Sequence, residues 1–184
     1  AAAFHVVGTP ARAIGWGDIG EVAAQSRFKP EGGAGTFAFG ACVATVEVDT
    51  ETGEVRARGL VSVDDAGTLL NPMLAEGQVH GGLGLAVGAA LMEEMVYGSD
   101  GIPRTSSFAD YSVVSSAETI SFDCLEMETP SPLNPLGVKG VGESGTVVGT
   151  PALQSAVLDA LAPFGVEHLD LPYTSERVWA AIHG

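Results

Sequence analysis

An apolar stripe interrupted by glycines is the feature of this sequence that most constrains its fold. Val79, Leu83, Val87 and Leu91 recur at every fourth residue, which is the spacing of one face of a helix. Four glycines lie in the same segment, and each weakens a helix by about 1 kcal/mol relative to alanine (Gly81, Gly82, Gly84 and Gly88). A helix that keeps them needs close approach by a neighbouring backbone or by a ligand. Tight packing of the helix on a sheet accounts for at least some of these glycines.

Start and stop signals place the other elements around this helix. The predicted elements are a short helix at 19–24 capped by Asp18, strands at 37–48 and 55–64 joined by a turn at 49–54, the helix from Asn71-Pro72 to about Glu94, a hairpin around 98–101, a strand at 120–127, a helix capped by Thr150-Pro151, and a last helix at 175–182 capped by Thr174. We therefore predict an α+β fold, with an antiparallel, hairpin-rich sheet and three or four packed helices. Residues 1–35 are predicted to be a lead-in segment and linker, and residues 36–184 a single domain.

Composition excludes several classes of partner. Hydrophobic residues make up 46% of the chain and charged residues 17%, which is sufficient for a packed core. Asp and Glu number 23 against 8 Lys and Arg, a net charge of −15 that repels nucleic acids and anionic lipid surfaces. The spacing of Cys42 and Cys124 fits neither a zinc site nor a disulfide framework, so both are predicted to be buried free thiols. The four histidines are scattered, and a metal centre held by protein side chains is not supported.

A glycine-rich loop presents one carboxylate. Residues 137–145 read Gly-Val-Lys-Gly-Val-Gly-Glu-Ser-Gly, and Glu143 is the acid among them. Glycines allow a backbone to approach a ligand closely, so Glu143 is interpreted as a base presented to a bound group. The alternatives are a flexible surface loop and a carboxylate that accepts hydrogen bonds from loop amides. A phosphate cradle is disfavoured, because the Gly-Lys-Ser/Thr ending is missing and Glu143 would repel phosphate. Lys139 is predicted to be a surface lysine.

Five sequence pieces occur in an order that resembles a known family. The pieces are Phe39-Gly-Ala41 with Val46-Glu-Val-Asp-Thr-Glu-Thr-Gly-Glu54, then Asp65-Ala-Gly67, then Asn71-Pro-Met-Leu-Ala-Glu-Gly-Gln-Val-His-Gly-Gly82, then Pro135-Leu-Gly-Val-Lys-Gly-Val-Gly-Glu-Ser-Gly145, and finally Leu171-Pro-Tyr-Thr-Ser-Glu-Arg-Val-Trp179. Together they resemble the C-terminal part of the molybdopterin-binding large subunit of the xanthine dehydrogenase, aldehyde oxidase and carbon monoxide dehydrogenase family. The form is nearer the bacterial carbon monoxide dehydrogenase-like branch than the eukaryotic xanthine enzymes.

The resemblance implies a molybdenum hydroxylase that uses water as its oxygen source. Molybdenum is then held by the dithiolene of molybdopterin, with the cytosine dinucleotide form as one option, which explains why no Cys/His ligand cluster is present. Glu143 matches the general base that takes a proton from the molybdenum-bound hydroxyl. Gln78, Gly142 and Ser144 match contacts to the cofactor, although Gln78 could instead hydrogen-bond nearby backbone. At Leu85 this chain lacks the glutamine that the family often has, so a second glutamine contact is not expected.

The resemblance also implies partners. The family's large subunit is several times longer than this chain, so we expect the chain to be inactive without the remainder of that subunit. FAD-binding and [2Fe–2S] subunits are expected beside it, and the substrate is a small molecule of open identity. Location in the cytoplasm is expected, with the periplasm left open because upstream signals would be missing. A non-catalytic assembly domain derived from the same family is the alternative.

Overall fold

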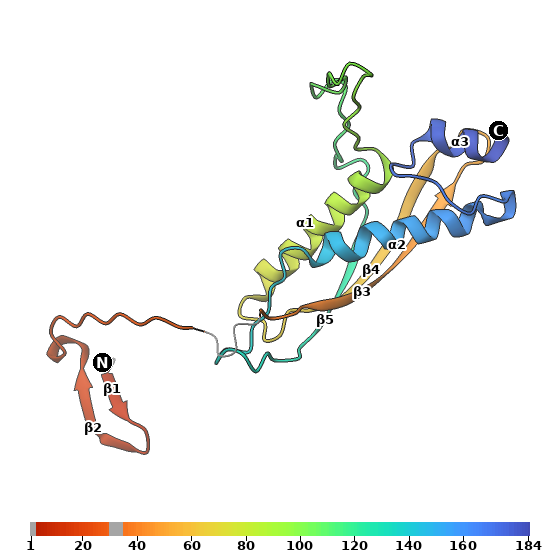
Figure 1. Cartoon of the computed structure of the whole chain (residues 1–184). Coiled ribbons are helices and arrows are strands. Elements are labelled where there is room, and N and C mark those ends of the chain that lie inside the picture. The colour runs from red at the N-terminus through yellow and green to blue at the C-terminus, as the bar shows by residue number, and fades with distance from the viewer. Residues whose placement is uncertain (1–2, 30–34) are drawn as a thin grey trace. The chain divides into compact units, whose positions relative to one another are not determined.

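The computed structural model describes residues 3–29 and 35–184, and the chain divides into two compact units, Ala1–Gly33 and Ala34–Gly184 (Figure 1). Each unit is described by itself. The linker predicted over residues 29–35 lies mostly outside the described residues.

The first unit is a small hairpin. Strand β1 (Ala3–Val6) pairs antiparallel with β2 (Thr9–Gly15), and Phe4 lies opposite Ile14. A 3-10 turn (Trp16–Asp18) follows, and residues 20–29 carry no helix or strand. The helix predicted at 19–24 is therefore wrong. Gly20 has a φ of 69°, a left-handed conformation that a right-handed helix cannot continue through.

The second unit is built on a three-stranded sheet in the order β3-β4-β5. Strands β3 (Phe39–Val48) and β4 (Val55–Asp65) pair antiparallel, whereas β5 (Phe122–Met127) runs parallel to β4. The predicted α+β class is confirmed. The predicted antiparallel pairing holds for β3 and β4, whereas β5 lies parallel to β4, an arrangement that a hairpin cannot produce. A parallel neighbour requires a long crossover, which here includes helix α1 (Pro72–Leu91).

The turn at 49–54 forms as predicted. The Asp49 carboxylate accepts hydrogen bonds from the amides of Glu51 and Thr52, at 2.9 and 3.1 Å, and Gly53 has a φ of 75°. A side chain on Gly53 would also collide with the backbone of the last helix, α3 (Ser175–His183). The hairpin tip therefore docks on α3. At the hairpin predicted around 98–101, the chain forms a turn closed by a single bridge between Tyr97 and Pro103.

The helix starts illustrate where local signals hold and where they fail. Asn71 caps α1 by accepting a hydrogen bond from the Leu74 amide at 3.2 Å, and Thr174 caps α3 through the Arg177 amide at 3.4 Å, both as predicted. Helix α2 (Ser144–Leu161) begins six residues before the predicted cap at Thr150, so Pro151 lies inside it. Its glycine-rich first turns have poor intrinsic propensity, and packing on α1 compensates for that weakness.

Helices α1 and α2 pack side by side on one face of the sheet, as Figure 1 shows. They touch through glycines: a Cβ on Gly82 would lie 2.9 Å from the Thr146 nitrogen, and one on Gly145 would lie 2.5 Å from the Val79 carbonyl oxygen. The Thr146 hydroxyl also donates to the Gly82 carbonyl at 3.2 Å. The contacts advance in the same direction along both helices, from Gly82 with Gly145 to Ala86 with Gly149, so the helices run parallel.

The core lies between these two helices and the sheet. Its fully buried members come from β4, α1 and α2, with Tyr173 and Val178 added from the C-terminal segment (Leu60, Leu83, Val87, Leu153, Val157 and Leu161). Helix α2 has the length and hydropathy of a possible membrane span, but its Leu153, Val157 and Leu161 form the stripe of a core helix. The predicted stripes of both helices are therefore confirmed as core-facing.

A buried ion pair joins the end of β4 to the glycine-rich loop. The Lys139 ammonium lies 3.0 Å from an Asp65 carboxylate oxygen, and the two side chains are 8% and 0% exposed. The amides of Gly67 and Thr129 donate to the same oxygen, at 2.9 and 3.2 Å, and the ammonium also lies 4.7 Å from the centre of the Phe39 ring. The prediction of a surface lysine is wrong, because Asp65 supplies the charge partner that a buried lysine requires.

Burial alone would raise the pKa of Asp65. Hydrogen bonds from Thr129, Gly67 and Lys139 outweigh that effect and hold the pKa of this carboxyl well below its usual range. The ionised form is therefore the one that the folded chain stabilises.

We predict opposite effects for alanine at two glycines of this helix pair. Gly145→Ala should lower the free energy of unfolding by about 1–3 kcal/mol, because its Cβ would press on the Val79 carbonyl and force the helices apart. Gly84→Ala is the matched control, since its Cβ meets no atom within 4 Å; it should raise stability by up to about 1 kcal/mol. Denaturant unfolding of the two variants measures both. Equal effects would contradict the glycine contact.

We predict that Asp65 makes the fold sensitive to acid. Because its folded pKa is depressed, its contribution to stability is complete above the unfolded pKa of about 3.9 and is lost as the pH falls below that value. Asp65→Asn should therefore be less stable than the unchanged chain at neutral pH. It should also lose less stability between about pH 4 and about pH 2, the interval that lies below the unfolded pKa of Asp. Urea midpoints across this range test it, with the exposed Asp123→Asn as control.

Candidate functional site

The glycine-rich loop is held at its base by a network of backbone bonds. The Gly137 carbonyl accepts from the amides of Thr68 and Ser131, at 3.0 and 2.9 Å. The Asn134 side chain bonds both the amide and the carbonyl of Val138, at 3.0 and 2.9 Å. The Lys139 amide donates to the Ala66 carbonyl at 2.8 Å. Together with the Asp65–Lys139 pair, these bonds make the segment before Glu143 a fixed support rather than a flexible surface loop.

Glu143 lies immediately before α2. Its carbonyl accepts the first helical bond from the Val147 amide at 3.0 Å. Its side chain does not cap the helix, and it lines a cavity of about 550 Å³ together with residues 36–40, Val147 and Val148. The carboxylate is exposed. Within the described residues, the Glu143 side chain therefore accepts no hydrogen bond from the α2 amides. The described chain also does not bury Glu143, although burial was expected of a general base.

Gln78 lies beside this loop. It occupies the second turn of α1, is exposed, and its amide oxygen would be 3.6 Å from a Cβ placed on Gly142. It also lines a small cavity of about 240 Å³ with Asn71, Leu74 and Val141. The structure thus brings together the amide and the carboxylate loop, which are 65 positions apart in the sequence.

The two remaining predicted residues lie on either side of Glu143. Gly142 is exposed, and Gly140 leaves open space where a side chain would be, so the backbone between them is accessible. Ser144 is half-buried, and both its amide and its hydroxyl donate to the Val141 carbonyl at 3.3 Å. The Ser144 side chain therefore closes the turn that leads into α2.

The two cysteines are free and half-buried, in partial agreement with the predicted buried thiols. Cys42 and Cys124 flank Ser62 from opposite sides on strands β3 and β5. Strands two positions apart are separated by about 10 Å, beyond the reach of a disulfide. Burial, with a smaller contribution from the Asp64 carboxylate, raises the pKa of Cys124 to about 11. Among the described residues, no cluster of three or more His, Cys, Asp or Glu side chains is arranged to hold a metal ion.

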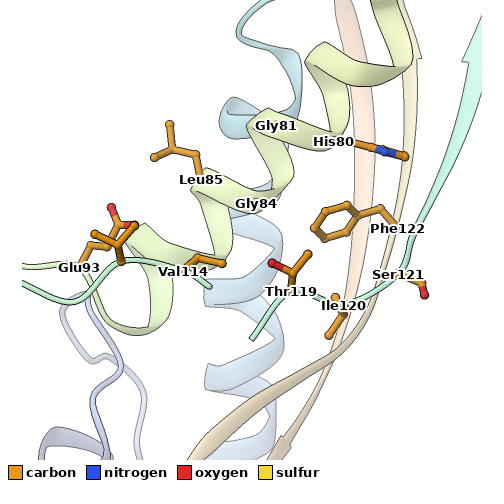
Figure 2. Close-up of a pocket in the computed structure, with 11 residues that line it drawn as sticks. His80, Gly81, Gly84, Leu85, Glu93, Val114, Thr119, Ile120, Ser121 and Phe122 are labelled. Atoms are coloured by element: carbon orange, nitrogen blue, oxygen red, sulfur yellow. The ribbon is translucent and has the colours of Figure 1, made fainter. Parts of the chain in front are cut away.

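A larger cavity, of about 750 Å³, lies elsewhere and contains neither Glu143 nor Gln78 (Figure 2). Figure 2 shows Gly81 and Gly84 of α1 on one side and the 119–122 segment on the other, with His80 near Phe122, at 5.8 Å between ring centres. Its one carboxylate, Glu93, accepts a hydrogen bond from the Tyr111 hydroxyl at 3.3 Å. Leu85, where the family often has glutamine, lies in this wall. The predicted site residues Glu143 and Gln78 therefore line the two smaller cavities and not this one.

Sequence reasoning assigned no role to three residues that contribute to the site. Phe37 and Phe39 line the cavity beside Glu143, and Asp65 anchors the loop through Lys139. Asp65 was part of a quoted motif, Asp65-Ala-Gly67, but no role followed from the motif alone. The signal that could have found it is an acid at the buried end of a strand, which needs a cationic partner.

Comparison with known proteins gives one consistent family. Residues 7–120 match the molybdopterin cofactor-binding domain family. The large chain of carbon monoxide dehydrogenase from Hydrogenophaga pseudoflava is 40% identical over 147 residues, covering 80% of this chain and 18% of that protein. The nicotine 6-hydroxylase large subunit of Paenarthrobacter nicotinovorans is 39% identical over 148 residues, with 80% and 18% covered.

A solved structure agrees with these sequence matches. Quinoline 2-oxidoreductase from Pseudomonas putida 86 superimposes with a TM-score of 0.82 at 32% identity, over 98% of this chain and 25% of that chain. The chain therefore spans about one fifth of the length of the curated relatives it matches. From its sequence and its fold, this chain belongs to the molybdopterin cofactor-binding domain family, as part of a molybdenum-binding large subunit of the carbon monoxide dehydrogenase and xanthine dehydrogenase type.

Proposed function

We propose that this chain supplies the general base and one wall of the cofactor site of a molybdenum hydroxylase. The observation that carries the proposal is the placement of the Glu143 loop beside the Gln78 amide, on a support fixed by the Asp65–Lys139 pair and by the α1–α2 glycine contact. The Glu143 side chain makes no cap bond to α2, so its carboxylate is available to a bound group.

The residues present fit a molybdopterin group. Helix α2 begins at Ser144, so its N-terminal amides are hydrogen-bond donors beside the loop that carries Glu143. The exposed backbone at Gly140 and Gly142 would allow the cofactor to approach, and the Gln78 amide offers donors and an acceptor without adding charge. Gln78, Gly142 and the amide of Ser144 are the groups that would hold it. When bound, the cofactor supplies two-electron oxidation chemistry and a water-derived oxygen.

The role of Glu143 is to accept the proton of the water-derived nucleophile. A base of this kind works best with a pKa near the working pH, and burial is what raises a carboxyl pKa. Glu143 is exposed in this chain, so the burial must come from the remainder of a large subunit. The chain alone is then inactive, in line with its coverage of 18% of the carbon monoxide dehydrogenase large chain.

The substrate is set outside this chain. The relatives are named for carbon monoxide, nicotine and quinoline, which differ in size and polarity, yet their similarity to this chain is comparable. The groups proposed here act on the proton and the cofactor, which are common to all three. FAD-binding and [2Fe–2S] subunits are proposed as partners that carry the electrons away, because relatives are named as a large chain or as one subunit of a dehydrogenase complex.

We predict that Glu143→Gln in the assembled enzyme lowers kcat by about 10²–10⁴-fold, the usual contribution of a positioned acid–base group. Molybdenum and pterin content should be unchanged, because the amide is nearly isosteric with the carboxylate. Turnover and cofactor content are the measurements, and Glu51→Gln, an exposed glutamate of the 49–54 turn, is the control. Full turnover in the Glu143 variant would favour the non-catalytic assembly domain.

We predict that Gln78→Ala weakens cofactor retention. Loss of one or two neutral hydrogen bonds costs about 1.4 kcal/mol, or about tenfold in affinity. The bound pterin per large subunit after extensive dialysis measures this effect, with Gln25→Ala, an exposed glutamine of the first unit, as the matched control. Unchanged retention would leave Gln78 as a residue that bonds only nearby backbone.

A further inference from the structure

The sheet has one face that is partly apolar and open. Helices α1 and α2 lie on the opposite face, as Figure 1 shows. Strand alternation directs Val43 and Val61 to the open face, where they pair across β3 and β4, and the next pair is Val63 with Leu125. We call this surface the open apolar face: it consists of Val43, Val61, Val63, Leu125 and Met127. One charged side chain, the exposed Asp123 of β5, lies on the same side of the sheet opposite Val61. Val43 is 66% exposed, Leu125 55%, Met127 47% and Val61 39%.

The other half of the same face has a different character. Near the 49–54 turn it carries Glu47, Arg56 and Arg58, and an Arg58–Glu47 ion pair of 2.6 Å spans β3 and β4. Those side chains are suited to water. The change from an ion pair to Val43, Val61 and Val63 within the β3–β4 pair indicates that only the apolar half is covered by another layer in the assembled protein.

The strand arrangement supports the same conclusion. Strand β4 has Leu60 fully buried under the helices and Val61 on the open side, so its apolar side chains point both ways. Its partner β5 likewise has apolar side chains on both sides, with Phe122 and Cys124 packed against the core and Leu125 on the open side. The second layer is absent from the described residues of the unit Ala34–Gly184.

We propose that the open apolar face docks the remaining part of the large subunit, through apolar side chains of an element that packs about 10 Å above the sheet. The inference rests on the proposed function for the identity of this partner. The chain corresponds to 18% of the carbon monoxide dehydrogenase large chain, so most of a large chain is available to form the second layer. A second copy of this chain is a poorer occupant, because each copy carries a net charge of −15 and two copies repel each other.

The first test uses the 184-residue chain alone. Val43→Lys and Leu125→Lys should reduce the fluorescence of bound 8-anilinonaphthalene-1-sulfonate at least twofold. The matched control is Thr45→Lys, on the same strand and face but outside the apolar half. Thermal unfolding checks that each variant folds, and Val43→Thr, which nearly keeps the side-chain volume, serves as a second and milder variant. Equal dye binding by all variants, or a dimer that the lysines dissociate, would overturn the proposal.

The second test measures docking directly. The chain is coexpressed with the Hydrogenophaga pseudoflava carbon monoxide dehydrogenase large chain from which the matching segment has been removed. The unchanged chain and Thr45→Lys should copurify with it, and Val43→Lys and Leu125→Lys should copurify at least tenfold less. Failure of the unchanged chain to copurify, or normal copurification of the lysine variants, would overturn the choice of partner.

Assembly and catalysis separate in this design. Glu143→Gln lies outside the open apolar face and should copurify fully, whatever its turnover. A loss of turnover with intact copurification therefore concerns the role of Glu143, and a loss of copurification with the lysine variants concerns the docking surface.

Discussion

The close contact between α1 and α2 determines where every functional group of this chain lies. Gly82 and Gly145 meet without side chains between them, so the two helix backbones approach more closely than alanine would allow. Because the helices run parallel, the start of α2 lies beside the second and third turns of α1, which brings the loop that carries Glu143 next to Gln78. The glycines that weaken α1 as an isolated helix are thus required by its packing, and their cost in helix propensity is offset by the contact they permit.

A second constraint acts on the loop before Glu143. Asp65 lies at the end of β4 and accepts three hydrogen bonds, from Gly67, Thr129 and Lys139. It therefore joins the strand end, the 66–68 turn and two later segments at one buried carboxylate. Lys139 is four residues from Glu143, so the ion pair and the glycine contact fix the loop from its two ends. A carboxylate on a loop held in this way keeps its position without any hydrogen bond to its own oxygens.

The sequence was sufficient for those parts of the fold that depend on local signals. The caps at Asn71 and Thr174, the 49–54 turn and the stripe of α1 follow from residues within one or two turns of one another. The start of α2 does not, because its first turns are stabilised by α1, more than 60 residues earlier in the chain. The same reason explains Lys139, whose partner Asp65 is 74 positions away. Glu143 was singled out by its glycine-rich loop and Gln78 through a resemblance, and only the structure places Gln78 beside that loop.

The exposure of Glu143 is what an incomplete site should look like. A general base in a complete active site is shielded from water on most sides, and here only the support behind it is present. The same incompleteness is visible on the sheet, where Val43 and Leu125 lie open while the charged half of that face is already suited to water. Both features have one physical explanation: the chain carries surfaces that were selected for burial against further polypeptide. Under the proposed function, the proton-accepting carboxylate lies on a rigid piece, and the groups that select the substrate belong to the polypeptide that covers it.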